Sequence, residues 1–299
     1  MRVLIVVNKW WECDPALSAM LNKDARPSGA PWPTQLASTP RPPEQFTAPN
    51  SNPSPRAVFP YGKFSAEVWC ISDLLQGLSI DQQSSSEEKA KRLGAIFTYG
   101  RQPDLVIAVG TASTPSVAIN RNGGVVIGTN VFMHNAYPNG GNPASNLQLK
   151  SFDRLVESTI SAAMFNKVSS FDAVSALSRF LPVPLNPSLS MDLSVGKGNV
   201  SLGTINVTNP ADYASKDLET VKAFTALGIA VVPVSLETTH GLIRDAGGDS
   251  PFVFVSGIVN RFQHYGADVA PRLHAQNTAG AHNAGVAVTW MLSSLDAQL

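Results

Sequence analysis

The sequence predicts an α/β protein: a single three-layer domain, residues 1–299, with a mostly parallel central sheet. Short continuous apolar runs recur along the chain, which is the pattern of strands buried on both faces. Segments with a helical pattern lie between these runs, and strands that alternate with helices favour a parallel sheet covered on both sides. The composition, 43% apolar and 15% charged, is that of a globular protein with a substantial core.

The amino-terminal part of the chain contains two expected strands and a proline-rich stretch. The first strand is expected at residues 3–7, where the sequence reads VLIVV. Residues 27–60 hold ten of the 22 prolines, which excludes regular helix and central strand. We interpret this stretch as an insertion, and a lid, a subunit contact and a disordered decoration all stay open. The next strand is expected at residues 66–71.

A helix is expected in SSSEEKAKRLGAIFTYG. The segment opens with two overlapping capping boxes, Ser84 with Glu87 and Ser85 with Glu88, and ends at Gly100. Further strands are expected at 104–110, 124–131, 201–207, 229–234 and 252–258, and further helices at 152–166, 216–227 and 277–295.

Charge and cysteine content exclude several classes of protein. The 22 Lys+Arg balance the 22 Asp+Glu, so we expect no nucleic-acid or membrane-surface partner. Two cysteines, Cys13 and Cys70, exclude a disulfide framework and a four-cysteine zinc site, and we interpret them as reduced thiols. The opening apolar run is too short for a signal peptide, and no stretch reaches the roughly 20 apolar residues of a membrane span. We therefore expect a cytoplasmic protein.

The common catalytic motifs are missing from the sequence. No G-x-G-x-x-G follows the first strand, and neither a phosphate-binding G-x-x-x-x-G-K-[ST] nor a G-x-S-x-G nucleophile motif is present. The five histidines do not have the spacing of zinc ligands. We expect no metal and no cofactor.

Polar residues instead follow several of the predicted strands. Ligands of open α/β sheets bind beyond the carboxyl ends of the strands, so these residues are expected to face one site. They are Glu12 after the first strand, Gly110, Thr111, Ala112 and Ser113 after the strand at 104–109, Glu237 after 229–234, and Asn260 after 252–258.

The same segments resemble purine nucleoside phosphorylases and methylthioadenosine/adenosylhomocysteine nucleosidases. PDLVIAVGTAST and GGVVIGTNVFMH are similar to their glycine-turn and following strand segments, and FVFVSGIVN to their strand ending in S-[DN]. VSLETTHGL places Leu236 at the family's methionine and Glu237 at its acid. VLIVVNKWWE places Glu12 where the nucleosidase branch has a glutamate. The matching pieces cover about half of the chain, in the family's order.

The resemblance implies a phosphorylase/hydrolase-like fold that cleaves the N-glycosidic bond of a purine nucleoside. Glu237 would accept hydrogen bonds from the ribose 2′- and 3′-hydroxyls and stabilise the positive charge that grows on the sugar. Glu12 would deprotonate the attacking water, and Asn260 would hydrogen-bond the leaving purine. The residues also allow plainer roles: an exposed turn acid for Glu237, a first-turn helix acid for Glu12 and a strand-end amide for Asn260.

The remaining candidate residues would shape the pocket. The turn at 110–113 would line the sugar or nucleophile site through its amides and hydroxyls, although a turn of small residues is common in such sheets. Tyr213 falls roughly where the family has an aromatic residue stacked on the base, and Phe262 is a second candidate for the pocket. Both aromatic side chains are equally suited to a hydrophobic core.

The choice between water and phosphate as nucleophile rests on positive charge. Phosphate favours arginine or a nest of amides. The resemblance to the hexameric phosphorylases would place an arginine just before Gly110, but the sequence there is Ala108-Val109, and Lys9 is the only cation after the first strand. The predicted function is therefore a purine nucleoside N-ribosyl hydrolase. A phosphate-dependent phosphorylase and a catalytically silent nucleoside-binding relative stay open. The family also implies a homo-oligomer, with a dimer favoured, and Asn260 argues against an adenine-type substrate.

Overall fold

A computed structural model describes residues 1–21, 54–79, 82–83, 85–114, 124–128, 130–134, 148–150, 193–195, 198–202, 234–237, 239–261 and 274–299. The strands are β1 (Arg2–Val7), β2 (Ala57–Tyr61), β3 (Phe64–Cys70), β4 (Leu105–Thr114), β5 (Val125–Gly128), β6 (Asn130–His134), β7 (Gln148–Lys150), β8 (Leu193–Val195), β9 (Gly198–Leu202), β10 (Val234–Glu237) and β11 (Phe252–Arg261). The helices are α1 (Trp10–Leu21), α2 (Ile71–Leu74), α4 (Ser86–Thr98), α8 (His240–Ala246) and α10 (His274–Gln298).

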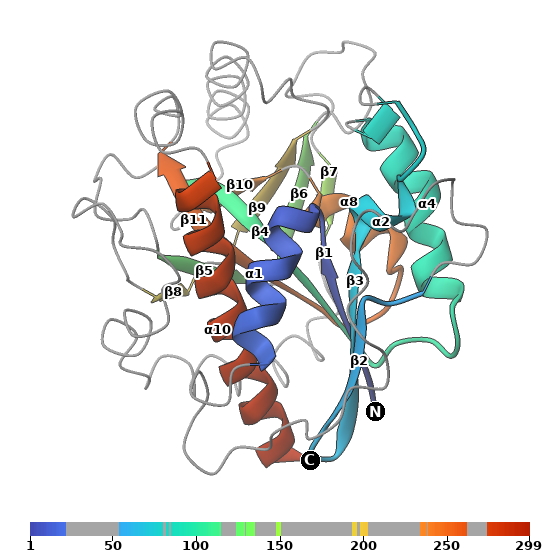
Figure 1. Cartoon of the computed structure of the whole chain (residues 1–299), viewed down its shortest axis with the longest axis vertical. Helices are drawn as coiled ribbons and strands as arrows, with labels where there is room; N and C mark the ends of the chain where they lie inside the picture. Colours follow the sequence, from blue (N-terminus) through green and yellow to red (C-terminus); the bar gives the residue numbers. More distant parts are fainter. Residues whose placement is uncertain are drawn as a thin grey trace.

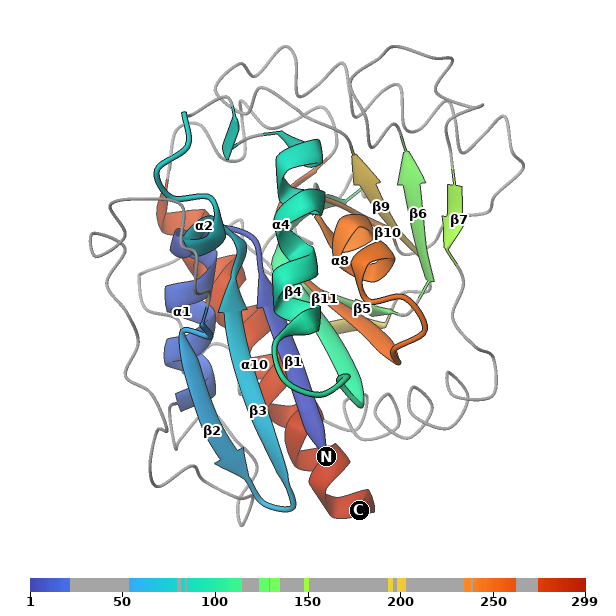
Figure 2. The ribbon, with the colours of Figure 1, turned by 90° about the vertical axis from the view of Figure 1, so that its right-hand side faces the viewer.

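The described strands form one mixed sheet with helices on both faces (Figures 1 and 2). Its order is β2-β3-β1-β4-β10-β9-β6-β7, and β11 joins it beside β4, followed by β5 and β8. Six of the ten pairings are parallel. The predicted three-layer α/β fold with a mostly parallel sheet is confirmed. That residues 1–299 form one domain stays a prediction.

Alternate residues of β1 pack into different layers, which explains its continuous apolar sequence. Val3, Ile5 and Val7 belong to a buried cluster that includes side chains of α1 and α10. Leu4 and Val6 belong to a second cluster with side chains of α4 and α8. Because successive side chains of a strand point to opposite faces, a strand covered on both sides has no position for a polar residue.

Several expected elements are confirmed with changed limits. The predicted helix after residue 84 is α4, and the hydroxyl of Ser85 accepts a hydrogen bond from the backbone N–H of Glu88, as the second capping box requires. Ser84 lies outside the described residues, as do residues 152–166, 216–227, 203–207 and 229–233. The strand predicted at 124–131 is wrong as one element: β5 pairs with β11, whereas β6 pairs with β9. The break falls at Gly128-Thr-Asn130, which the apolar pattern did not separate.

Only the end of the proline-rich stretch is described, and it forms part of β2. This strand contains Pro60 and lies at the edge of the sheet, where it pairs with β3 alone among the described strands. An edge strand tolerates proline because one side of its backbone has no ladder partner to lose. The exclusion of a central strand is therefore confirmed for residues 54–60, and the rest of the expected insertion, residues 27–53, lies outside the described residues.

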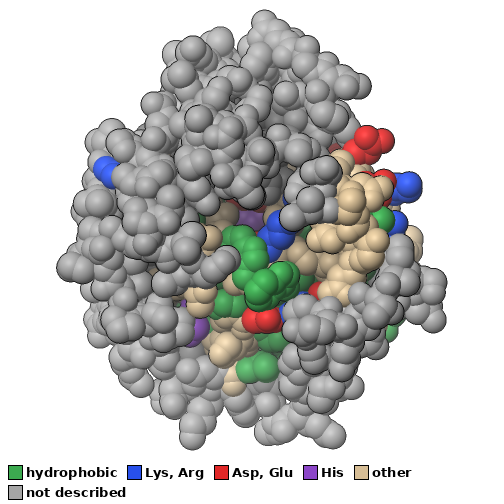
Figure 3. All heavy atoms as spheres, turned by 45° about the horizontal axis from the view of Figure 1, so that its top comes forward, with side chains coloured by type: hydrophobic (Ala, Val, Ile, Leu, Met, Phe, Trp, Pro, Cys, Tyr) green, Lys and Arg blue, Asp and Glu red, His purple; other side chains and the backbone are tan. Residues whose placement is uncertain are grey.

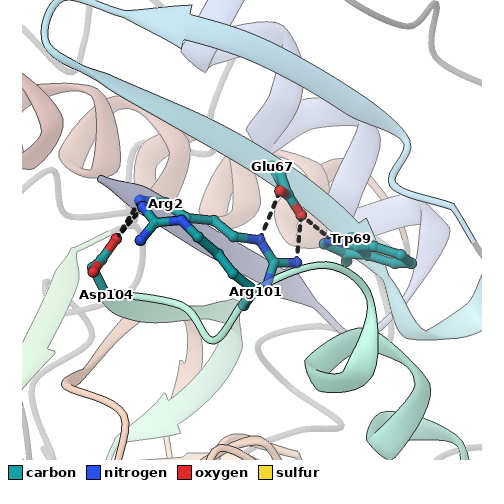
Figure 4. Close-up of polar contacts among 5 residues, drawn as sticks. All are labelled: Arg2, Glu67, Trp69, Arg101 and Asp104. Carbon is teal, nitrogen blue, oxygen red and sulfur yellow. Dashed lines mark hydrogen bonds and ion pairs between the residues drawn. The ribbon is translucent and has the colours of Figure 1, made fainter.

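A polar cluster fixes the amino ends of the central strands (Figure 4). The buried guanidinium of Arg2 makes two hydrogen bonds of 2.8 Å to the carboxylate of Glu67 on β3. The backbone N–H of Arg2 donates to Asp104 at 2.6 Å, and Arg101 donates to the same carboxylate oxygen at 2.7 Å. The indole N–H of Trp69 also donates to Glu67, at 3.2 Å. These contacts join β3, β1 and the segment before β4.

The helix α10 lies unusually close to its neighbours because of three glycines. A Cβ atom at Gly257 of β11 would lie 2.0 Å from the carbonyl oxygen of Gly280, and one at Gly285 would lie 2.4 Å from the carbonyl oxygen of Ala16 on α1. No side chain fits at these positions, so the distances of α10 from β11 and from α1 depend on glycine.

Among the described helices, none combines the length and hydrophobicity of a membrane span.

Candidate functional site

The expected site residues come together around the carboxyl end of β4. Ser113 pairs with Leu236 of β10 on one side and with Asn260 of β11 on the other. The strand β1 lies between β3 and β4 and runs parallel to both, and its last residue, Val7, pairs with Val109 of β4. The carboxyl ends of β1, β4 and β11 therefore lie side by side in parallel strands, as the strand-end reasoning predicted, and the end of β10 lies next to them.

One orientation differs from the expectation. β10 runs antiparallel to β4, not parallel, and Glu237 is its last residue instead of the residue after the strand. The pairing falls at Leu236 and Ser113, next to the ends of both strands. Glu237 therefore reaches the same edge of the sheet from the opposite direction. In β11, a bulge between Ile258 and Asn260 shifts the register beside Ser113.

Glu12 is buried, and three hydrogen bonds from two residues hold its carboxylate. It lies in the first turn of α1, directly after β1, and is 4% exposed. One carboxylate oxygen accepts hydrogen bonds from the backbone N–H and the hydroxyl of Thr111, at 2.8 and 2.6 Å. The other accepts from the backbone N–H of Lys9 at 3.0 Å. Glu12 is thus a first-turn helix acid, but it also reaches across to Thr111 of β4. The turn expected at residues 110–113 is wrong, because β4 continues to Thr114.

Opposing effects act on the pKa of Glu12. Burial raises the pKa above its ordinary value, because a carboxylate loses its hydration. The hydrogen bonds from Thr111 and Lys9 lower it, and the negative charge of Glu237 raises it again. The net shift is upward, so the carboxylate is a stronger base than one in water.

Glu237 is also buried, at 6% exposed, which excludes the role of an exposed turn acid. Its carboxylate accepts hydrogen bonds from the backbone N–H and hydroxyl of Thr239, the latter at 2.9 Å, and from the backbone N–H of His240 at 2.6 Å. The carboxylate therefore ties the end of β10 to the start of α8. The negative charge of Glu237 contributes to the raised pKa of Glu12, so the two acids belong to one site.

His240 is a site residue that the sequence analysis did not single out. Its side chain is 0% exposed, and its ring stacks on Phe254 with a centroid distance of 5.8 Å. Nδ1 lies 3.8 Å from Oε1 of Glu237, beyond hydrogen-bond distance. Burial lowers the pKa of His240, and the nearby charge of Glu237 opposes the shift only in part. The available signal was its place three residues after Glu237, at the start of α8.

Lys89 is the second residue that the sequence did not single out. It lies in the first turn of α4 and is 3% exposed. Burial, together with the positive charge of Lys9, lowers its pKa to about 8, against the opposing charges of the two site acids. Burial also lowers the pKa of Lys9, although Glu12 raises it. Two lysines and two carboxylates therefore interact in one place.

The other predicted residues have mixed outcomes. Ala112 and Ser113 are buried in β4, and Asn260 is 1% exposed. The amide nitrogen of Asn260 donates to the carbonyl oxygen of Arg261 at 3.0 Å, whereas its Oδ1 has no hydrogen-bond partner among the described residues. Tyr213, Phe262 and the side chain of Leu236 lie outside the described residues.

The donor set is that of an acid–base site. In the part of the chain that the structure describes, no group of three or more His, Cys, Asp and Glu side chains could hold a metal ion.

The end of the molecule turned toward the viewer in Figure 3 shows hydrophobic side chains at the centre, with basic and histidine side chains beside them. A polar ligand with an apolar face suits such a surface.

Comparison with known proteins shows a fold likeness. The sequence matches no family model, and no curated protein matches it either. The structure is similar to the 5′-methylthioadenosine/S-adenosylhomocysteine nucleosidase of Neisseria meningitidis, solved with methylthio-immucillin-A, with a TM-score of 0.54, 14% identity and coverage of 98% of this chain and 100% of that one. The S-adenosylhomocysteine nucleosidase of Streptococcus pyogenes matches with a TM-score of 0.55 and 14% identity, over 99% of this chain and 97% of that one. A futalosine hydrolase mutant of Helicobacter pylori matches with a TM-score of 0.53 and 11% identity, over 100% of both chains. The fold that the sequence resemblance implied is confirmed.

Proposed function

We propose that this protein is a hydrolase that cleaves the N-glycosidic bond of purine nucleosides. The observation that carries the proposal is the buried Glu12 carboxylate, oriented by Thr111 and Lys9, with a second buried acid, Glu237, in the same site. The solved structures that share the fold and were compared above are nucleosidases or a futalosine hydrolase, which supports the same reaction class.

The two acids suit the two demands of the reaction. As the bond from C1′ to the purine nitrogen breaks, its electron pair leaves with the purine and positive charge develops on the ribose. Glu237 would accept hydrogen bonds from the ribose hydroxyls and stabilise that charge. Water forms the new bond at C1′ and gives a proton to Glu12, whose raised pKa suits a general base.

Asn260 would contact the departing base. Its side-chain amide is buried next to Ser113, and one of its N–H groups is engaged by the carbonyl oxygen of Arg261. The second N–H would donate to a purine nitrogen, and Oδ1 would accept from an N–H of the base. An asparagine does not protonate the leaving group, so solvent supplies that proton. This favours a purine that leaves readily, such as a 6-oxopurine.

Water is favoured over phosphate because the charges of the site balance. Lys9 and Lys89 add two positive charges, but Glu12 and Glu237 offset them. A phosphate dianion would be attracted only by an excess of positive charge or by a nest of amides. A phosphorylase is the second candidate, and the buried Lys89 is the observation in its favour.

The test is release of free base from adenosine, methylthioadenosine, adenosylhomocysteine, inosine and guanosine, each with and without phosphate. Release without phosphate supports the proposal, whereas strict phosphate dependence supports the phosphorylase. No release, together with stabilisation against heat by a nucleoside, supports a silent binding protein.

Variants of the two acids assign their roles. Glu12→Gln should lower kcat by about 10²–10⁴-fold and keep nucleoside binding, as expected for loss of a general base. Glu237→Gln should lower kcat/KM by about 10²–10³-fold. The control is Glu87→Gln, which removes an exposed acid of α4 and should change neither value. An oligomer, with a dimer favoured, and a cytoplasmic location also stay proposals.

A further inference from the structure

His240 is a buried imidazole with unused hydrogen-bonding capacity. It is 0% exposed, and neither ring nitrogen has a hydrogen-bond partner among the described residues. Leaving a buried polar group unsatisfied costs free energy, so such groups are rare in folded proteins unless a ligand or a water completes them. The ring is held in place by Phe254, on which it stacks. The position is therefore fixed while the nitrogens are left for another partner.

One of these nitrogens borders the same space as the proposed base. A Cβ atom at Gly110 would lie 3.3 Å from Nε2 of His240 and 3.7 Å from Oε1 of Glu12. Because residue 110 is glycine, this space on the surface of β4 holds no side chain. A Cβ atom at this point would be in contact with both groups, so Nε2 and Oε1 flank the same side of Gly110, and a water between them can approach both. The oxygen of Glu12 that borders the space is the one that Thr111 orients.

The neighbouring charges favour a neutral ring with a defined tautomer. Among the described residues, the charge of Glu237 acts on His240, and Glu12, Lys9 and Lys89 interact with one another and in part with Glu237. Burial favours the neutral form of His240, so one nitrogen carries a hydrogen and the other accepts. Nδ1 is the nitrogen nearer to the carboxylate of Glu237, at 3.8 Å, and is the one that should carry the hydrogen. Nε2 is then an acceptor.

We propose that Nε2 of His240 and Oε1 of Glu12 together hold the attacking water, and that this pair of acceptors selects water as the nucleophile. The inference rests on the proposed hydrolase function. Water can donate one hydrogen to each acceptor, which directs a lone pair of its oxygen at C1′. When the C1′–O bond forms, the proton on the Glu12 side passes to that carboxylate. His240 orients the water and takes no proton.

The first test compares three variants of His240. Phenylalanine keeps the ring and its stacking on Phe254 but has no acceptor, so His240→Phe should lower kcat about 10- to 100-fold with little change in KM. His240→Gln places an amide oxygen at nearly the position of Nε2 and should recover most of the loss, whereas the shorter His240→Asn should not. Thermal unfolding of each variant checks that the fold is kept.

The second test asks which nucleophile the site accepts. Methanol has a single O–H hydrogen and can donate to only one of the two acceptors. Hydrolysis is run in dilute methanol, and the methyl riboside is measured against free ribose. In His240→Phe the share of methyl riboside should rise by about three- to tenfold, the worth of one hydrogen bond. A residue needed only for folding would not change this ratio.

The outcomes separate this inference from the proposed function. If the unaltered protein releases no base from any nucleoside, the proposed function fails. If it hydrolyses a nucleoside but His240→Phe keeps its kcat and its product ratio, only the role of His240 is wrong. Gly110→Ala gives an independent check, because its methyl group would lie 3.3 Å from Nε2 and 3.7 Å from Oε1 and would hinder a water from approaching both. This variant should lose activity like His240→Phe, with only a small loss of thermal stability because the imidazole must shift slightly, and full activity in it would also overturn the inference.

Discussion

The hydroxyl of Thr111 offers a direct way to change the base strength of Glu12. It donates a 2.6 Å hydrogen bond to the carboxylate, and the backbone N–H of the same residue donates a second bond at 2.8 Å. Thr111→Val removes the first bond, keeps the second and conserves the shape of the side chain. Thr111→Ser keeps both bonds and serves as the matched control.

The size and sign of the effect follow from which form of Glu12 the bond stabilises. A hydrogen bond to a charged group contributes about 1.5–3 kcal/mol, and 1.36 kcal/mol corresponds to one pKa unit. The bond favours the ionised carboxylate, so its loss should raise the pKa of Glu12 by about one to two units. Since the base works when ionised, the acid limb of the kcat/KM profile should move to higher pH by that amount.

The measurement is kcat/KM as a function of pH for the unaltered protein, Thr111→Val and Thr111→Ser, with the nucleoside that is cleaved fastest. The serine variant should keep the acid limb where it is. A valine variant that loses rate equally at all pH values, with the limb unmoved, would show that Glu12 does not titrate as the base.

Two further predictions concern stability. Burial lowers the pKa of Lys89 from its ordinary value to about 8, so keeping it charged below pH 8 costs about 3 kcal/mol. Lys89→Met should therefore raise the unfolding free energy at pH 7. Between pH 8 and the ordinary pKa of lysine, the unfolded chain binds more protons than the folded one, so the unaltered protein gains stability as the pH rises. The stability advantage of Lys89→Met should therefore shrink over this range. An advantage that stays equal at all pH values would contradict the prediction. Glu67→Ala leaves the buried Arg2 without its carboxylate partner and should cost about 3 kcal/mol in denaturant unfolding with kcat unchanged. Lys91→Ala, which removes an exposed pair, should cost less than about 1 kcal/mol, and equal losses in both would refute the difference between buried and exposed pairs.

Much of the sheet was predictable because its strands have a local signature. A strand covered on both faces, such as β1, must be apolar at every position, and the acid that follows it at residue 12 then stands out. The same reasoning located Glu237 and Asn260 at the edge of the sheet. The direction of β10 was not predictable, because a strand of four residues that pairs with β4 only at Leu236 and Ser113 carries no pattern that distinguishes parallel from antiparallel pairing.

Lys89 and His240 escaped the sequence analysis for a related reason. Neither residue follows a predicted strand. Lys89 enters the site from α4, and its burial depends on how that helix packs against α8, a contact between segments far apart in the chain. His240 lies close to Glu237 in sequence, but its place beside Gly110, which Glu12 also approaches, follows only from the packing of α8 and α1 on β4.

The glycine at position 285 makes the position of Glu12 depend on the contact between α1 and α10. Glu12 and Ala16 stand four residues apart on α1, hence on one side of it, and the backbone at Ala16 touches α10 where a side chain at 285 has no room. Any bulk added there must push the two helices apart. Glu12, the proposed proton acceptor, would move with its helix while Thr111 stayed with the sheet. A larger side chain at position 285 should therefore lower turnover before it causes unfolding.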